Sequence, residues 1–272
     1  MSQWTRDLAD LVVFEPLDAP HPASGPADAD VRALFGDGGE DGDGKGGGSE
    51  RGGGAGVGYR EWWDARRDPS TNRTVYHGAG ASLRGVAAAW QAAATSGAPF
   101  DGVLGFSQGG AVAALLLAAA SGGDAAQATL AALDEAGWRW DEGGAPPAPG
   151  AADASGGDST VATTSEWSAA AGDDFAAFLR LDPPPRVAVL VASFAPRSGE
   201  GVRVPEGSVS TPSVHVVGAA DPAAPGGERL ARLFRDSRMV RHPGGHKFPR
   251  LDAKALETVR GVLEAVRQSL RM

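Results

Sequence analysis

Short apolar runs alternate with amphipathic stretches along most of this chain. The clearest run is Arg186 to Phe194, RVAVLVASF, which is continuous and rich in β-branched residues. Such a run is typical of a strand that is covered on both faces. Shorter apolar runs predict four further strands, at Leu11 to Phe14, Val103 to Gly105, Val214 to Val217 and from Met239 onward.

Segments with the apolar spacing of a helix lie between these strands. Leu83, Val86, Trp90 and Ala94 recur at the period of a helix. Further helices are predicted at Gly109 to Ala120, at Glu228 to Phe234 and at Asp252 to Leu270, the last with an apolar stripe and with Asp252 as its N-cap. Strands that alternate with helices favour βαβ units. We therefore expect an α/β fold with a mostly parallel sheet flanked by helices.

Two low-complexity stretches interrupt this pattern. Residues 36–58 are acidic and glycine-rich, and residues 143–164 are rich in Ala, Pro, Gly and Ser. Neither stretch carries enough apolar area to offset the entropy of ordering it. The predicted strands and helices on the two sides of each stretch fit one alternating α/β pattern. We therefore expect a single domain over residues 1–272 that carries two insertions.

Composition excludes several classes of function. The net charge of −9 argues against a nucleic-acid or anionic-membrane partner, which would require clustered Lys and Arg. The absence of Cys excludes disulfides, thiolate metal sites and cysteine nucleophiles. No secretory signal and no membrane-spanning apolar run is visible. We expect a cytoplasmic protein, with a nuclear location as the alternative, and predict no oligomeric state.

The stretch DGVLGFSQGGAVAAL carries the strongest chemical signal. Ser107 lies between Gly105 and Gly109 in the pattern G-x-S-x-G, which a chain with 40 Gly can also produce by chance. The context decides, because a predicted strand precedes the serine and a predicted helix follows it, as a nucleophile turn requires. A serine nucleophile needs a base, an orienting acid and donors for the oxyanion, and the Gln108 N–H is the predicted donor.

The acid and the base are expected later in the chain, each just past a strand end, in the order Ser, Asp, His. Asp221 follows the strand SVHVVG, and His246 follows the last strand. Gly244 and Gly245 would let the intervening loop turn back toward the serine. His242 is the main alternative base, but it lies on or at the end of its strand.

Other candidates have simpler interpretations. His215 falls in the middle of a predicted strand and is expected to be packed or hydrogen-bonded. Phe106, Phe194 and Phe248 lie near predicted strand ends and could line an acyl pocket, although core packing explains them equally well.

Five segments carry a family resemblance. They are PFDGVLGFSQGG at 99–110, VHVVGAADPAAP at 214–225, HPGGHKFP at 242–249, PLDAPH at 16–21 and GYREWWD at 58–64. Together they resemble the FSH-type serine hydrolases of the α/β-hydrolase superfamily. The resemblance implies that Ser107, Asp221 and His246 are nucleophile, acid and base. It also implies cleavage of esters or thioesters of small to medium acyl groups, without a cofactor or metal.

The sequence departs from the family at its start. Members normally begin with a strand that ends in His-Gly, whose loop donates a second N–H to the oxyanion. Here Trp4 to Leu8 resembles the last turn of the helix that follows this strand, so the fold is expected to be incomplete at the N-terminus. We favour an incomplete gene model; alternatively the chain lacks the strand, which would put its activity in doubt.

The sequence thus predicts a serine hydrolase that acts on a small-molecule acyl ester or thioester through a Ser-Asp-His triad and an acyl-enzyme. The alternatives are a non-catalytic or degenerate binding protein of the same fold and an acyltransferase that uses the same triad.

Overall fold

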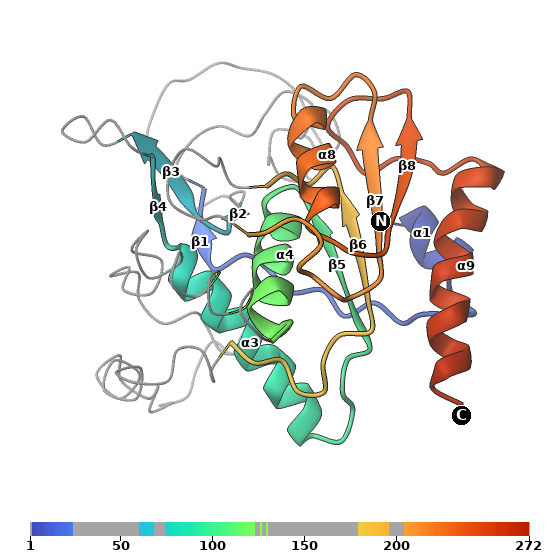
Figure 1. Ribbon diagram of the computed structural model, residues 1–272, viewed down its shortest axis with the longest axis horizontal. Coiled ribbons are helices and arrows are strands. Elements are labelled where there is room, and N and C mark those ends of the chain that lie inside the picture. Colours follow the sequence, from blue (N-terminus) through green and yellow to red (C-terminus); the bar gives the residue numbers. More distant parts are fainter. Residues whose placement is uncertain are drawn as a thin grey trace, which may run out of the picture.

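A four-stranded parallel sheet forms the centre of the computed structural model, which describes residues 2–23, 60–67, 74–122, 126, 129, 179–195 and 204–271. Its strands, in spatial order, are β5 (Gly102–Phe106), β6 (Val187–Val191), β7 (Ser213–Gly218) and β8 (Ser237–His242). All three neighbouring pairs are parallel, so their carboxyl ends meet at one edge of the sheet (Figure 1). The two predicted insertions, 36–58 and 143–164, lie outside the described residues.

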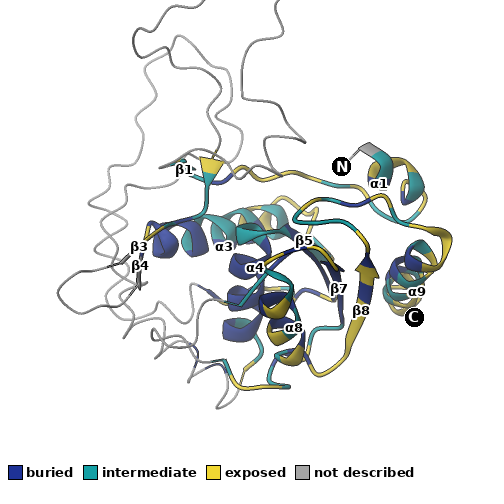
Figure 2. Ribbon diagram, turned by 90° about the horizontal axis from the view of Figure 1, so that it is seen from above, coloured by how far each residue is buried: buried dark blue, intermediate teal, exposed yellow. Residues whose placement is uncertain are grey.

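Helices cover both faces of this sheet (Figures 1 and 2). On one face α4 (Gln108–Ala120) and α8 (Ala224–Arg232) contact the strands, and α3 (Ala79–Thr95) packs against α4. On the other face lie α9 (Ala253–Ser269) and the short α1 (Ser2–Asp7). The predicted α/β class with a parallel sheet between helices is confirmed.

The strands differ in burial. Every residue of β6 is buried, because the strand has a partner on each side and helices on both faces. This confirms the continuous apolar run as a strand covered on both faces. In β5, by contrast, only Gly105 is fully buried, and the strand has one sheet partner among the described residues.

The closing helix follows its sequence signals. Asp252 is the N-cap of α9, and its Oδ1 accepts a hydrogen bond from the Ala255 N–H at 2.8 Å. Ala255, Val259 and Leu263 form the buried stripe against the sheet. Capping and amphipathicity thus determine both the start and the orientation of this helix.

The predicted strand at Leu11 to Phe14 is wrong. Leu11 and Val12 donate their N–H groups to the Leu8 carbonyl and so continue the turn that ends α1. Leu11, Val12 and Phe14 pack against the core between the sheet and α9, whereas Val13 is 97% exposed. Three of the four apolar side chains therefore reach the core from a backbone that joins no sheet within the described part of the chain.

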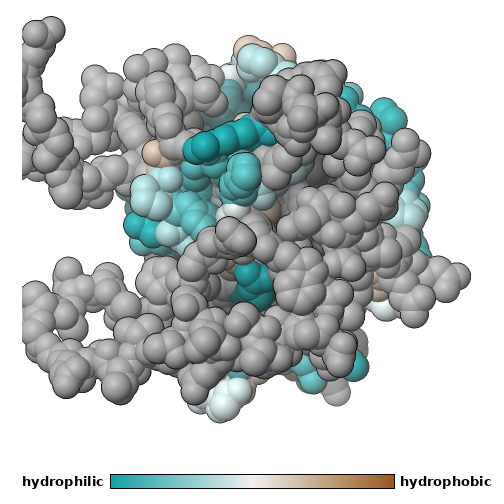
Figure 3. Space-filling view, turned by 90° about the vertical axis from the view of Figure 1, so that its left-hand side faces the viewer, coloured by the Kyte–Doolittle hydropathy of each residue, from teal (hydrophilic) through white to brown (hydrophobic). Residues whose placement is uncertain are grey.

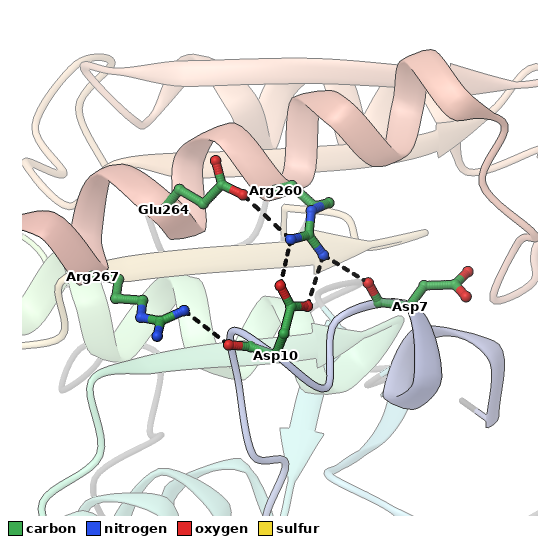
Figure 4. Close-up of polar contacts among 5 residues, drawn as sticks. All are labelled: Asp7, Asp10, Arg260, Glu264 and Arg267. Carbon is green, nitrogen blue, oxygen red and sulfur yellow. Dashed lines mark hydrogen bonds and ion pairs between the residues drawn. The ribbon is translucent and has the colours of Figure 1, made fainter.

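Ion pairs attach this N-terminal segment to α9 (Figure 4). The Arg260 guanidinium donates to both carboxylate oxygens of Asp10, at 2.8 and 2.6 Å, and to the Asp7 carbonyl at 3.0 Å. Arg267 donates to the Asp10 carbonyl at 2.9 Å. The hydrogen bond from Arg260 lowers the pKa of Asp10 to about 2, so this carboxylate is charged at neutral pH. The segment is thereby fixed to the last helix.

Two small antiparallel pairs lie beside α3. They are β1 (His21–Pro22) with β2 (Arg60–Glu61), and β3 (Asp64–Arg67) with β4 (Thr74–His77). Strands this short carry no readable periodicity, so the sequence did not predict them. On this side of the molecule the described residues at the surface are mostly hydrophilic (Figure 3). No helix in the described part of the chain is long and apolar enough to cross a membrane.

Candidate active site

Ser107 occupies the sharp turn between β5 and α4. Its backbone has φ 53° and ψ −122°, a conformation that L-residues rarely adopt. Its N–H donates to the Val191 carbonyl of β6 at 3.0 Å, which holds the turn against the neighbouring strand. This strained strand-to-helix turn lifts the serine side chain above the carboxyl edge of the sheet, as a nucleophile turn requires.

Glycines allow this turn to form. A Cβ on Gly105 would lie 2.4 Å from the Gly110 Cα, and a Cβ on Gly110 would lie 1.7 Å from the Ser193 Oγ. The strand, the helix and Ser193, two residues after β6, therefore approach too closely for a side chain at either glycine. Gly109 has a different neighbour, the Trp62 ring, whose Nε1 would lie 3.0 Å from an added Cβ. That position 110 has no room for a side chain was not predicted from the sequence.

Three side chains from distant parts of the chain form one line of hydrogen bonds. The His246 Nε2 lies 2.8 Å from the Ser107 Oγ, and the His246 Nδ1 lies 3.0 Å from the Asp221 Oδ2. The Asp221 side chain is 2% exposed, and its Oδ1 accepts the Ala223 N–H at 2.7 Å. A carboxylate at Nδ1 favours the tautomer with its proton there, so Nε2 can accept the serine proton.

Hydrogen bonds join the loops that carry the aspartate and the histidine. The Ala219 N–H donates to the His242 carbonyl at 2.7 Å, and the Ala220 N–H donates to the Gly244 carbonyl at 3.1 Å. A Cβ on Gly218 would lie 2.4 Å from the latter oxygen. The two loops can meet because Gly218 has no side chain.

Gly244 and Gly245 lie in the loop that brings His246 back to Ser107, as expected. Neither has a positive φ, so the loop does not use the left-handed conformations that favour glycine. The Gly244 N–H donates to the His242 Nδ1 at 3.1 Å, and a Cβ on Gly244 would lie 2.5 Å from the Lys247 Cε.

The other two histidines of this region are not bonded to Ser107. His242 ends β8 as a buried side chain, and its Nε2 has no hydrogen-bond partner in the described structure. Burial, with the nearby Lys247 charge, lowers the pKa of His242. His215 is buried in β7 against Phe234, with its Nε2 3.0 Å from the Ser213 Oγ, and burial lowers its pKa to about 4. His215 is thus a packed, hydrogen-bonded residue, as the sequence indicated.

The three predicted pocket phenylalanines divide into two groups. The Phe106 ring lies 5.5 Å from the His246 ring and 5.9 Å from the Phe248 ring, measured between centroids. Trp4 supports this group, because it stacks edge-on against Phe248 at 4.7 Å and donates from Nε1 to the Pro249 carbonyl at 2.9 Å. Phe194 forms the second group and packs against the core between α3 and α4.

Two features of the site were missed by sequence reasoning. The Gln108 side chain is bonded to the main chain of Trp62 and Trp63, which the sequence indicated only as part of a family-like segment. Ala192, at the end of β6, has a positive φ of 47° beside the turn of Ser107. No local pattern signals a strained alanine, because the strain depends on the neighbouring strands.

A parallel sheet with a serine on a strand-to-helix turn, and with an aspartate and a histidine after the ends of two later strands, here β7 and β8, defines the α/β-hydrolase class. The family model "Serine hydrolase (FSH1)" matches residues 1–257. The chain therefore belongs to the FSH1 family of serine hydrolases, as its motifs indicated.

Two individual proteins are similar to this chain. Esterase OVCA2 of Bos taurus is 30% identical over 155 residues, which are 56% of this chain and 44% of the relative. The chain thus matches less than half the length of that esterase. The solved structure of Zea mays acyl-protein thioesterase 2 is 15% identical, with a TM-score of 0.39, over 77% of this chain and 74% of the other.

Proposed function

We propose that this protein hydrolyses carboxylic esters or thioesters of small molecules, with Ser107 as nucleophile, His246 as base and Asp221 as the acid that orients it. The observation that carries the proposal is the line of two hydrogen bonds, 2.8 and 3.0 Å long, that joins these three side chains. Membership of the serine hydrolase family supports the same reaction class.

In the first half of the reaction the Ser107 Oγ attacks the acyl carbonyl carbon, and the His246 Nε2 takes the hydroxyl proton. The tetrahedral intermediate then breaks its bond to the leaving group, which departs as an alcohol or thiol with the proton from His246. Asp221 keeps the imidazole in the productive tautomer and stabilises its charged form. The product of this half is an acyl group on Ser107.

In the second half a water molecule gives its proton to His246 and attacks the acyl carbonyl. The bond to the Ser107 Oγ breaks, the proton returns to that oxygen, and a carboxylic acid leaves. The Gln108 N–H is the proposed oxyanion donor in both halves. It begins α4, where the first amides of a helix have no carbonyl partner within the helix.

The experiment compares wild type with Ser107→Ala on p-nitrophenyl esters of increasing acyl length. Wild type should release p-nitrophenol, and the variant should not, while circular dichroism shows both folded. A folded wild type that binds esters without turnover would contradict hydrolysis and favour a binding protein of this fold. Adding an alcohol acceptor distinguishes hydrolysis from acyl transfer. An acyltransferase would form a new ester with the alcohol in place of the free acid.

A further inference from the structure

Trp62 lies against the first turn of α4, beside the nucleophile turn. A Cβ on Gly109, two residues after Ser107, would come within 3.0 Å of the Trp62 Nε1 and 3.5 Å of its Cε2. Gly109 therefore leaves the room that the indole occupies. The indole is only partly buried, although it packs against the core between α3 and α4.

Three hydrogen bonds hold the Trp62–Trp63 main chain in this position. The Trp62 N–H donates to the Gln108 Oε1 at 3.0 Å, and the Gln108 Nε2 donates to the Trp63 carbonyl at 3.2 Å. The hydroxyl of Ser82, which is fully buried in the first turn of α3, donates to the Trp62 carbonyl. Because Gln108 is also the residue after Ser107, the place of the indole is coupled to the nucleophile turn.

The neighbouring tryptophan has a different environment. Trp63 is 2% exposed and stacks edge-on against Tyr76, with 5.8 Å between ring centroids. It anchors the segment in the core, so Trp62 is not needed as that anchor. A partly exposed aromatic ring that is held rigidly beside a reactive group is typical of ligand sites, since it offers apolar contact at little entropic cost.

We propose that Trp62 is the specificity-determining wall of this site, against which an apolar acyl group of the substrate packs. The inference rests on the proposed function. Phe106 and Phe248 provide apolar surface on the His246 side, and the Trp62 indole provides it on the α4 side of Ser107. A longer acyl chain covers more of the indole, so the contribution of Trp62 to binding grows with chain length.

The test is the ratio of kcat/KM for p-nitrophenyl hexanoate to that for p-nitrophenyl acetate. Trp62→Ala should lower this ratio by about 10-fold or more, chiefly by raising KM for the hexanoate. Trp62→Phe, which keeps an aromatic ring, should recover most of the ratio. If Trp62→Ala does not fold, the hexanoate-to-acetate ratio of kcat/KM is measured for Trp62→Phe and Trp62→Leu instead. The ratio should fall more for the leucine variant than for the phenylalanine variant.

Trp90→Phe is the matched control. Trp90 lies on α3, is 2% exposed and donates from Nε1 to the Pro183 carbonyl at 2.8 Å, away from the nucleophile turn. Replacing Trp90 should leave the hexanoate-to-acetate ratio of kcat/KM unchanged. An equal loss on both esters, no loss, or a gain for the hexanoate with the Trp62 variants would overturn the inference.

Labelling by a fluorophosphonate distinguishes a failure of the proposed function from a failure of the inference about Trp62. Labelling of wild type and of every folded Trp62 variant supports the proposed function whatever the ester ratio is. A folded wild type that is never labelled contradicts the proposed function itself.

Discussion

Ser107 and His246 meet at 2.8 Å, yet the chain holds the two residues by different means. On the nucleophile side, a strained backbone with φ 53° is held by contacts so close that Gly105 and Gly110 admit no side chain. On the acid–base side, Asp221 and His246 lie in two loops joined mainly by hydrogen bonds, such as that from the Ala220 N–H to the Gly244 carbonyl.

This contrast indicates which substitutions each side of the site cannot tolerate. The nucleophile side depends on volume, because one added methyl group has no space to occupy. The acid–base side depends chiefly on donors, acceptors and charge, because hydrogen bonds join its two loops; volume matters there at Gly218, where the Gly244 carbonyl crosses. The two sides should therefore respond to different kinds of substitution.

Asp221→Asn has the largest expected effect among the substitutions that separate the two sides, and it breaks only the acid–base side. The amide removes the negative charge at the His246 Nδ1 and disfavours the tautomer that accepts the serine proton, so kcat should fall by about 10⁴-fold. Ester hydrolysis measures the loss, and thermal unfolding checks the fold. A loss smaller than 10-fold would contradict the role given to this aspartate.

Gly110→Ala breaks the nucleophile side instead. Its new Cβ would lie 1.7 Å from the Ser193 Oγ, so the free energy of unfolding should fall by about 1–3 kcal/mol or more. Urea unfolding measures the change. Gly261→Ala on α9 is the matched control, because nothing lies within 4 Å of its Cβ, and it should gain about 0.5–1 kcal/mol through helix propensity. Equal effects of the two variants would contradict the crowding at the turn.

His215, on the strand β7 that precedes Asp221, offers a pH-dependent test. Burial lowers the pKa of His215 to about 4, so acid protonates this residue in the unfolded chain before it does so in the folded one. Its contribution to stability is therefore complete above pH 6.5 and is lost as the pH falls toward 4, by about 2–3 kcal/mol at pH 4.5. Urea unfolding of wild type and His215→Gln should show a shallower decline for the variant. Parallel curves would contradict a buried, neutral His215.

The sequence predicted best what contiguous residues determine. β6, α4 and α9 follow from an apolar run, a nucleophile motif and a capped amphipathic stripe. The strand-end rule further predicted that Ser107, Asp221 and His246 would meet, and the three side chains do lie within hydrogen-bonding distance. Their catalytic roles are our proposal.

What the sequence did not predict depends on contacts between distant segments. Gly218 is required because the Gly244 carbonyl crosses it, and no local pattern records that crossing. The place of Trp62 beside Gly109 depends in the same way on the Gln108 side chain. The strand predicted at Leu11 to Phe14 was wrong, because three of its four side chains reach the core without a strand partner among the described residues.

The most direct test of the central claim is to map the adduct of a fluorophosphonate by tandem mass spectrometry. The account predicts one covalent adduct on Ser107, formed in wild type, slowed in His246→Ala and absent in Ser107→Ala. An adduct on another serine, or a folded wild-type protein that forms none, would contradict it.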